Sequence, residues 1–226
     1  MIHFVVDDRA VDIPTWVVDL KSFRRWADDE AFPAKSGISY LLDEVWVDLS
    51  REHLFLHNEV KTEINTILRT LAKGKGWGRY FSAGAFFSNV EADFSNQPDG
   101  MFVSNESLRA GRVRSLRGRR GGHIELEGSP DMVLEVVGRS TAGRDDRELR
   151  DAYFLAGVRE YWLINALETP LRFEILRPGR SRFVAVRSRR GWTRSAVFAH
   201  SFRLVGQRGE DGYPAFTLEA RADAPA

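Results

Sequence analysis

The sequence predicts an α/β (α+β) fold in which a mixed central sheet carries helices on its faces. Apolar residues recur at helical intervals from residue 57 to about 73. Residues 130–137 open with Pro-Asp and continue as an apolar run with one carboxylate, Glu135, inside it, which is the composition of a strand buried on both faces. Around these two segments the elements read in the order helix, strands, helix and strand.

The remaining elements complete a single domain. The 226 residues allow one sizeable core, and we expect one domain over 1–226 with its core at about 38–205. Irregular helical spacing over 11–30 predicts an N-terminal helix or two. We expect strands at 38–42, 44–49, 79–82, 85–90, 98–104 and 161–164, a helix over about 144–156, and a glycine-rich loop over 109–122. Hairpins are predicted over 172–176, 182–186 and 192–202, with frayed residues at 221–226.

Composition excludes several classes of site. The 33 basic and 32 acidic residues give a formal charge of +1, so net charge does not indicate a nucleic-acid partner. The absence of cysteine excludes disulfides, thiolate zinc sites and cysteine nucleophiles. Charge appears too early after Met1 for a signal peptide, and no apolar run approaches the roughly 20 residues needed to span a bilayer. We therefore expect a cytoplasmic protein with no membrane partner.

Two carboxylates stand in apolar strands. Ionised Glu135 would be costly to bury alone, so it must be paired, exposed at a strand end or bound to a metal. Asp99 introduces another strand in a similar Pro-Asp setting. Two carboxylates on neighbouring strands can hold Mg²⁺ or Mn²⁺, because hard divalent ions prefer oxygen ligands. In the alternative, Glu135 forms an ion pair with an arginine at a strand end.

Three motifs occur in a defined order and spacing. They are QPDGMFV at 97–103, SPDMVLEVVGRST at 129–141, and a tyrosine at 153 followed by AGVREYWLI at 156–164. Together they resemble the Uma-type restriction endonuclease family, a branch of the PD-(D/E)XK nuclease superfamily. The resemblance runs from about Tyr40 to Leu204. It implies a restriction-endonuclease-like mixed central sheet flanked by helices, with an extra N-terminal helix and C-terminal hairpins.

The resemblance also implies a metal site, with Asp99 as the first ligand and Glu135 as the second. The superfamily usually places a lysine two residues after the acidic residue, where this chain has Val137. The resembling family places it on the next helix, where this chain has Leu149, and no lysine follows Lys75.

Either Arg147 or Arg150 then substitutes as a catalytic residue, or activity is reduced or lost. Arginine can stabilise charge but transfers protons poorly, because it stays protonated at any working pH.

Other charged residues have both a functional and a structural interpretation. Glu63 borders the apolar stripe of its helix and is a candidate third metal ligand, or it pairs with Lys61 or Arg69 on a solvated face. His57 matches a frequent family position, and we expect it to cap or pack. We expect Asp131 to be structural at a strand entry, and Asp145 and Asp146 to lie at a helix N-terminus. Trp46, Trp162 and Trp192 are expected to anchor the core.

One basic cluster is a candidate nucleic-acid surface. Its arginines are Arg109, Arg112, Arg114, Arg117, Arg119 and Arg120, of which we select Arg112, Arg114, Arg117 and Arg119 as phosphate-binding candidates. The alternative is a mobile, solvated hairpin loop.

The sequence thus predicts an Mg²⁺- or Mn²⁺-dependent endonuclease that hydrolyses DNA phosphodiester bonds. The rival is a catalytically degenerate nuclease fold that binds nucleic acid or a protein partner, favoured by Val137 and Leu149. A third interpretation is a structural domain in which Glu135 is salt-bridged. The need to cut two strands and the apolar C-terminal hairpins suggest a homodimer.

Overall fold

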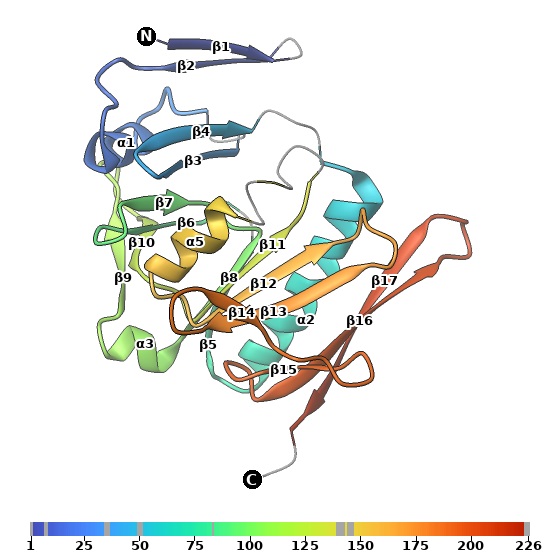
Figure 1. The fold of residues 1–226 in the computed structure, drawn as a ribbon. Coiled ribbons are helices and arrows are strands. Elements are labelled where there is room, and N and C mark those ends of the chain that lie inside the picture. The colour runs from blue at the N-terminus through green and yellow to red at the C-terminus, as the bar shows by residue number, and fades with distance from the viewer. Residues whose placement is uncertain are drawn as a thin grey trace.

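The computed structural model describes residues 2–6, 9–33, 37–48, 52–82, 84–138, 143 and 147–223 (Figure 1). Its body contains two six-stranded sheets. The first sheet has the order β4 (Glu44–Asp48), β3 (Gly37–Leu41), β7 (Phe94–Asn96), β6 (Phe86–Asn89), β10 (His123–Gly128) and β9 (Val113–Arg117). The second has the order β14 (Phe183–Ala185), β13 (Arg172–Pro178), β12 (Glu160–Asn165), β11 (Met132–Val136), β8 (Gly100–Ser104) and β5 (Gly78–Ser82).

Two smaller sheets and the helices complete the described chain. Hairpin β1 (Ile2–Val6) and β2 (Arg9–Ile13) lies at the N-terminal end of the molecule, and β15 (Thr193–Ser195), β16 (His200–Arg208) and β17 (Pro214–Ala222) form the C-terminal sheet (Figure 1). The helices are α1 (Leu20–Ala27), a π-helical turn η1 (Leu54–Glu59), α2 (Val60–Gly74), α3 (Asn105–Arg109) and α5 (Glu148–Leu155). No helix in these ranges has the length and apolar character needed to cross a bilayer.

The alternation of side chains along β11 explains the layers. Met132, Leu134 and Val136 pack against α2 and the C-terminal sheet, whereas Val133 packs against α5 and the first sheet. All five residues of β11 are buried. The second sheet is therefore covered on both faces, and Glu135 emerges on the face covered by α5.

The structure confirms the mixed α+β architecture and most of the predicted elements. The β3–β4 hairpin turns at Leu42 and Asp43, whose φ values of 56° and 61° suit a tight hairpin turn. Helix α2 confirms the helix predicted from residue 57, and β11 and β12 are buried strands paired in parallel. Asp145 and Asp146 lie outside the described residues.

Several expectations were wrong. Within the expected 109–122 loop, residues 113–117 form β9. Because β9 lies at the edge of its sheet, only Val113 is fully buried, and the segment lacks the apolar pattern of a strand. Hairpin β1–β2 and strand β7 were missed, the latter being too short for a periodic signal. Residues 221–222 are not frayed but end β17, which pairs with β16 along its whole length.

Asp131 is structural, as predicted. Its carboxylate accepts hydrogen bonds from the Ser104 backbone N–H at 2.7 Å and the Ser107 hydroxyl at 2.8 Å. Arg159 lies 3.1 Å away. This buried aspartate ties the end of β8 and the start of α3 to β11.

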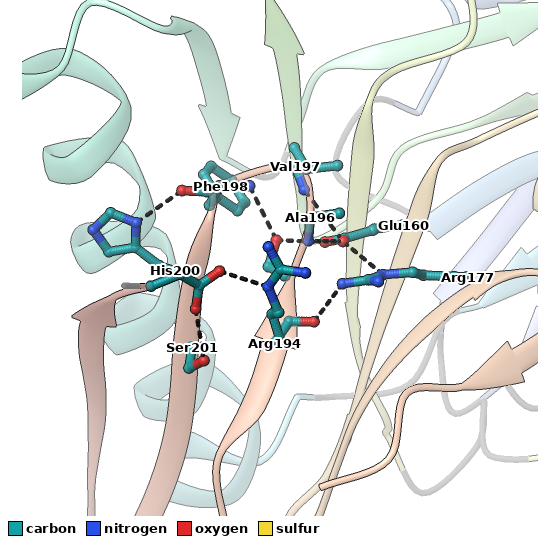
Figure 2. Close-up of polar contacts among 10 residues, drawn as sticks. Glu160, Arg177, Arg194, Ala196, Val197, Phe198, His200 and Ser201 are labelled. Carbon is teal, nitrogen blue, oxygen red and sulfur yellow. Dashed lines mark hydrogen bonds and ion pairs between the residues drawn. The ribbon is translucent and has the colours of Figure 1, made fainter. Parts of the chain in front are cut away.

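Glu160 fixes the C-terminal sheet to the second sheet (Figure 2). The side chain is fully buried at the start of β12. Its carboxylate accepts hydrogen bonds from Ser195 Oγ (2.6 Å), Ala196 N (2.6 Å), Val197 N (3.3 Å), Trp162 Nε1 (3.1 Å) and Arg177 Nε (3.2 Å). One carboxylate thus accepts hydrogen bonds from the turn after β15 and from the indole of Trp162. Trp162 is the core anchor that the sequence predicts.

Replacing Glu160 with alanine is expected to lower the free energy of unfolding by about 3–5 kcal/mol, because Arg177 and the backbone donors lose their buried acceptor. Urea unfolding followed by circular dichroism measures this loss. Glu219→Ala is the matched control: it breaks the solvent-accessible pair with Arg203 and should lower the free energy of unfolding far less. Equal losses in the two variants would show that Glu160 does not fix the sheet.

Candidate metal centre

Asp99 lies between β7 and β8, directly before the first residue of β8. Asp99 Oδ2 accepts a hydrogen bond of 2.8 Å from the Val136 backbone N–H on β11. The Asp99 carbonyl accepts one of 3.1 Å from Asn65 Nδ2 on α2. The register pairs Leu134 with Gly100, so Asp99 is the next residue along and comes opposite Glu135.

The glycine after Asp99 is required by this geometry. A Cβ at Gly100 would clash with the Tyr80 hydroxyl and with Asn65 Oδ1. These two side chains are hydrogen-bonded to each other at 2.6 Å. Gly100 therefore allows α2 to approach closely enough to hold the Asp99 backbone.

The π-helical turn and α2 bring three more polar side chains to Asp99. His57 Nε2 lies 3.6 Å from Asp99 Oδ2, and Lys61 Nζ lies 3.3 Å from Asp99 Oδ1. His57 and Lys61 are four residues apart and share one helical face. Glu52, just before the turn, lies 2.8 Å from Lys61 Nζ and 3.4 Å from His57 Nδ1. Glu52, His57 and Asp99 each offer one ligand atom, and these atoms lie within 4.8 Å of one another.

The charges of this cluster stabilise one another. Contact with His57 and then Lys61 lowers the pKa of Glu52 to about 2, although partial burial opposes the shift. Burial alone would lower the pKa of Lys61, but Asp99 and Glu52 outweigh burial and raise it. The pKa of His57 is raised in the same way, by Glu52 and Asp99 against burial. Lys61 is therefore a charged donor at neutral pH.

Glu135 lies near the same junction of β8 and β11, on the side covered by α5. Its carboxylate, only 6% exposed as a residue, accepts hydrogen bonds from the Tyr153 hydroxyl and from Asn96 Nδ2 at 3.2 Å. Burial, followed by the charge of Glu135, raises the pKa of Tyr153, which keeps the hydroxyl protonated. Glu135 stands outside the group of three ligand atoms within 4.8 Å. Val136, next to Glu135 in β11, links the two sides through its hydrogen bond to Asp99.

The other predicted site residues lie elsewhere. Glu63 Oε1 accepts a hydrogen bond of 2.9 Å from the Leu218 backbone on β17. It is two residues from both Lys61 and Asn65, about 200° around the helix and so on another face. Arg150 Nη2 donates to the Phe183 carbonyl at 3.4 Å, and Arg147 is an exposed residue directly before α5. Leu149 is fully buried in the core between α5 and the first sheet.

The arginine cluster on β9 and the β9–β10 turn is largely paired with acidic residues. Arg114 forms an ion pair with Glu127, Arg119 with Asp28 and Asp29, and Arg120 with Glu30. Arg112 and Arg117 form no ion pair with an acidic side chain among the described residues, and Arg117 is exposed. The acidic end of α1 thus offsets much of this positive charge.

Sequence reasoning missed Glu52, Lys61 and Asn96, and it gave His57 only a capping or packing role. The signal that was available is the spacing of His57 and Lys61 at i, i+4 on the helix before Asp99. Lys61 precedes Asp99 along the chain, whereas the family pattern places its lysine after Glu135, so that pattern did not indicate Lys61.

Two comparisons identify proteins that are similar to this chain. A family model described as "Uma2: Putative restriction endonuclease" matches residues 20–204. A crystal structure from Anabaena variabilis, described as a putative nuclease belonging to DUF820, aligns with a TM-score of 0.60 at 16% identity. The alignment covers 80% of this chain and 91% of that one. No curated protein sequence matches.

At that identity the structural likeness establishes the shared fold alone, whereas the family match covers most of the chain, including Glu52, Asp99 and Glu135. The chain belongs to the Uma2 family.

Proposed function

We propose that this protein is a divalent-metal-dependent endonuclease that hydrolyses phosphodiester bonds in DNA. The observation that carries the proposal is the Asp99 carboxylate, held by Val136 N–H at the junction of β8 and β11 with Glu52 and His57 beside it. Family membership supports a nuclease, and the neighbouring position of Glu135 in the strand register supports a second carboxylate at the same junction.

The donor set fits Mg²⁺ or Mn²⁺. Carboxylate oxygens from Asp99 and Glu135, with Glu52 close to Asp99, are the ligands that hard divalent ions prefer, and His57 adds a nitrogen that Mn²⁺ accepts. When bound, such an ion lowers the pKa of water and stabilises the negative charge that develops on the scissile phosphate. Tyr153 and Asn96 orient the Glu135 carboxylate.

Lys61 supplies the positive charge that Val137 and Leu149 cannot provide. Its ammonium is mostly buried and lies against Asp99 and Glu52, whereas Leu149 lies wholly within the core. A lysine held in its charged form donates hydrogen bonds, so we assign it to orienting the attacking water and the phosphate rather than to accepting a proton. Arg150 and Arg147, the substitutes expected from the sequence, lie on and next to α5, and Arg150 is engaged by Phe183.

The proposal extends to assembly and location. One centre per chain cuts one strand at a time, so cleavage of both strands of a duplex is served by a homodimer, which analytical ultracentrifugation would detect. We place this activity in the cytoplasm.

The double substitution of Asp99 by asparagine and Glu135 by glutamine should lower Mg²⁺-dependent cleavage of plasmid DNA by at least about 10²-fold. The amide oxygens still accept from Val136 N–H and Tyr153, so the unfolding midpoint should stay within about 5 °C of the natural value. The control replaces exposed Glu91 and Glu106 by glutamine and should cleave normally. Undiminished cleavage by the Asp99/Glu135 variant would sink the assignment, and a natural protein that binds Mn²⁺ but cuts no DNA would favour the degenerate rival.

Lys61→Met should reduce cleavage by about 10²–10³-fold, because it removes the only ammonium beside Asp99 among the described residues. It should leave Mn²⁺ affinity unchanged or higher, because the variant lacks a cation that competes for the same carboxylates. Lys73→Met, on the exposed last turn of the same helix, is the control. Single-turnover cleavage and Mn²⁺ titration separate the two effects. If Lys61→Met cleaves DNA at the natural rate, Arg147 or Arg150, and not Lys61, orients the attacking water and the phosphate.

A further inference from the structure

We propose that five arginines around strand β14 form the surface that binds the DNA backbone. This surface, called here the β14 arginines, consists of Arg180, Arg182, Arg187, Arg189 and Arg190. The inference rests on the proposed function for its substrate class, and it replaces the β9 cluster as the principal phosphate-binding surface.

Local composition first indicates this surface. Residues 172–208 contain ten arginines, whereas Glu174 is the one acidic residue in the same range. The near-neutral charge of the whole chain conceals this asymmetry, because the acidic residues lie in other segments. A strong local excess of arginine is the electrostatic pattern of a phosphate-binding surface.

The β14 arginines form no ion pair within the part of the chain that the structure describes. All five are exposed, and none of their side chains forms an ion pair or hydrogen bond with any residue in the described ranges. In the β9 cluster, by contrast, Arg114, Arg119 and Arg120 each face a carboxylate of the same chain. Binding phosphate through the β14 arginines therefore breaks no ion pair among the described residues, whereas binding through the β9 cluster would break several.

The backbone holds these arginines on defined turns. Gly179 N–H donates to the Arg182 carbonyl at 2.8 Å, which closes the β13–β14 hairpin. Arg189 and Trp192 exchange backbone hydrogen bonds of 2.9 and 3.0 Å around Arg190 and Gly191, which have φ values of 53° and 80°. The two turns stand at opposite ends of β14, which is the edge strand of the second sheet. The arginines are thus presented from fixed backbone.

Neighbouring side chains extend this positive surface. Trp192 is not the core anchor expected from the sequence, because it is only half-buried and lies beneath two guanidinium groups. Arg203 and Arg221 lie 5.0 and 4.2 Å from its ring centroid. Their stacking holds two further guanidinium groups next to the Arg189–Arg190 turn, of which that of Arg203 also pairs with Glu219 at 2.6 Å.

The surface packs against α5, the helix whose Tyr153 contacts Glu135. Phe183, the buried residue of β14, packs its ring against Phe154 of α5 at 5.8 Å between centroids. Arg150 of the same helix donates to the Phe183 carbonyl. Tyr153, adjacent to Phe154, donates to Glu135. A duplex held along β14 would therefore lie next to α5, the helix that carries Tyr153.

The spacing of the arginines fits a nucleic-acid duplex. Arg182 and Arg187 lie five positions apart on either side of β14, a separation of at most about 17 Å for extended chain. Duplex DNA carries one charge for about every 1.7 Å of its axis, so this length meets more phosphates than there are arginines. Guanidinium groups bind phosphate oxygens in a bidentate manner. The competing explanation is that charge on an edge strand prevents strand-to-strand association.

The test measures affinity for a fluorescein-labelled DNA duplex of about 30 base pairs by anisotropy in EDTA, from about 50 to 200 mM salt. Variant one replaces the β14 arginines by glutamine. The matched variant two replaces five arginines of the other cluster by glutamine, namely Arg112, Arg114, Arg117, Arg119 and Arg120. Circular dichroism confirms that both variants keep the natural fold.

We expect variant one to bind at least about 10-fold more weakly at low salt, with the slope of log K against log salt reduced by about 0.9 for each phosphate that the variant no longer neutralises. Variant two should keep a slope close to the natural one. An unchanged slope in variant one, or an equal loss of affinity in variant two, would overturn the inference. Aggregation of variant one with natural DNA affinity would assign the arginines to edge protection, and tighter natural binding to an RNA duplex of equal length would reject DNA as the partner.

EDTA keeps this result separate from the proposed catalysis. If binding depends on the β14 arginines but no cleavage follows on adding Mg²⁺, the surface stands and the nuclease proposal fails. If the natural protein cleaves DNA and variant one binds it as tightly as the natural protein, the nuclease proposal stands and the surface does not.

Discussion

The hydrogen bond from the Val136 backbone N–H to the Asp99 carboxylate is the constraint on which the candidate centre depends. It places an acidic side chain where a strand ladder would otherwise continue, with α2 on one side and Glu135 next to it in β11. The absence of a side chain at Gly100 allows Asn65 to hold the Asp99 backbone from α2. Two elements from distant parts of the sequence are thus joined at one carboxylate, whose position is set by backbone rather than by a flexible loop.

Charge balance explains why this junction is stable before any metal binds. Carboxylates brought together in a partly buried site repel one another and lose hydration, so a compensating cation is needed. Lys61 provides it by lying between Asp99 and Glu52, and His57 spans the same two groups. On the other face, Glu135 is held by neutral donors, Tyr153 and Asn96. A divalent ion would enter an arrangement that already accommodates positive charge.

Local sequence pattern was sufficient for β11, β12, α2 and the β3–β4 hairpin, because burial on both faces, helical spacing and turn chemistry are local properties. It also predicted Asp99 and Glu135 as a pair of metal ligands; Asp99 lies beside Glu52 and His57, and the pairing with Glu135 stays a prediction. It could not identify Lys61, whose contact with Asp99 lies 38 residues along the chain, or show that Glu63 binds the Leu218 backbone within β17. The sequence also could not show which arginines form ion pairs. Arg119 pairs with Asp28, 91 residues earlier in the chain, whereas Arg189 pairs with no acidic residue among those that the structure describes.

Calorimetric titration of Mn²⁺ into the natural protein and into Asp99→Asn tests the central claim most directly. Asparagine keeps an oxygen to accept from Val136 N–H but lacks the negative charge. We expect saturable binding to the natural protein and its loss in the variant, with the same unfolding midpoint in both. Equal binding by the two proteins, or no binding by the natural one, would contradict the view that Asp99 is the centre of a metal site.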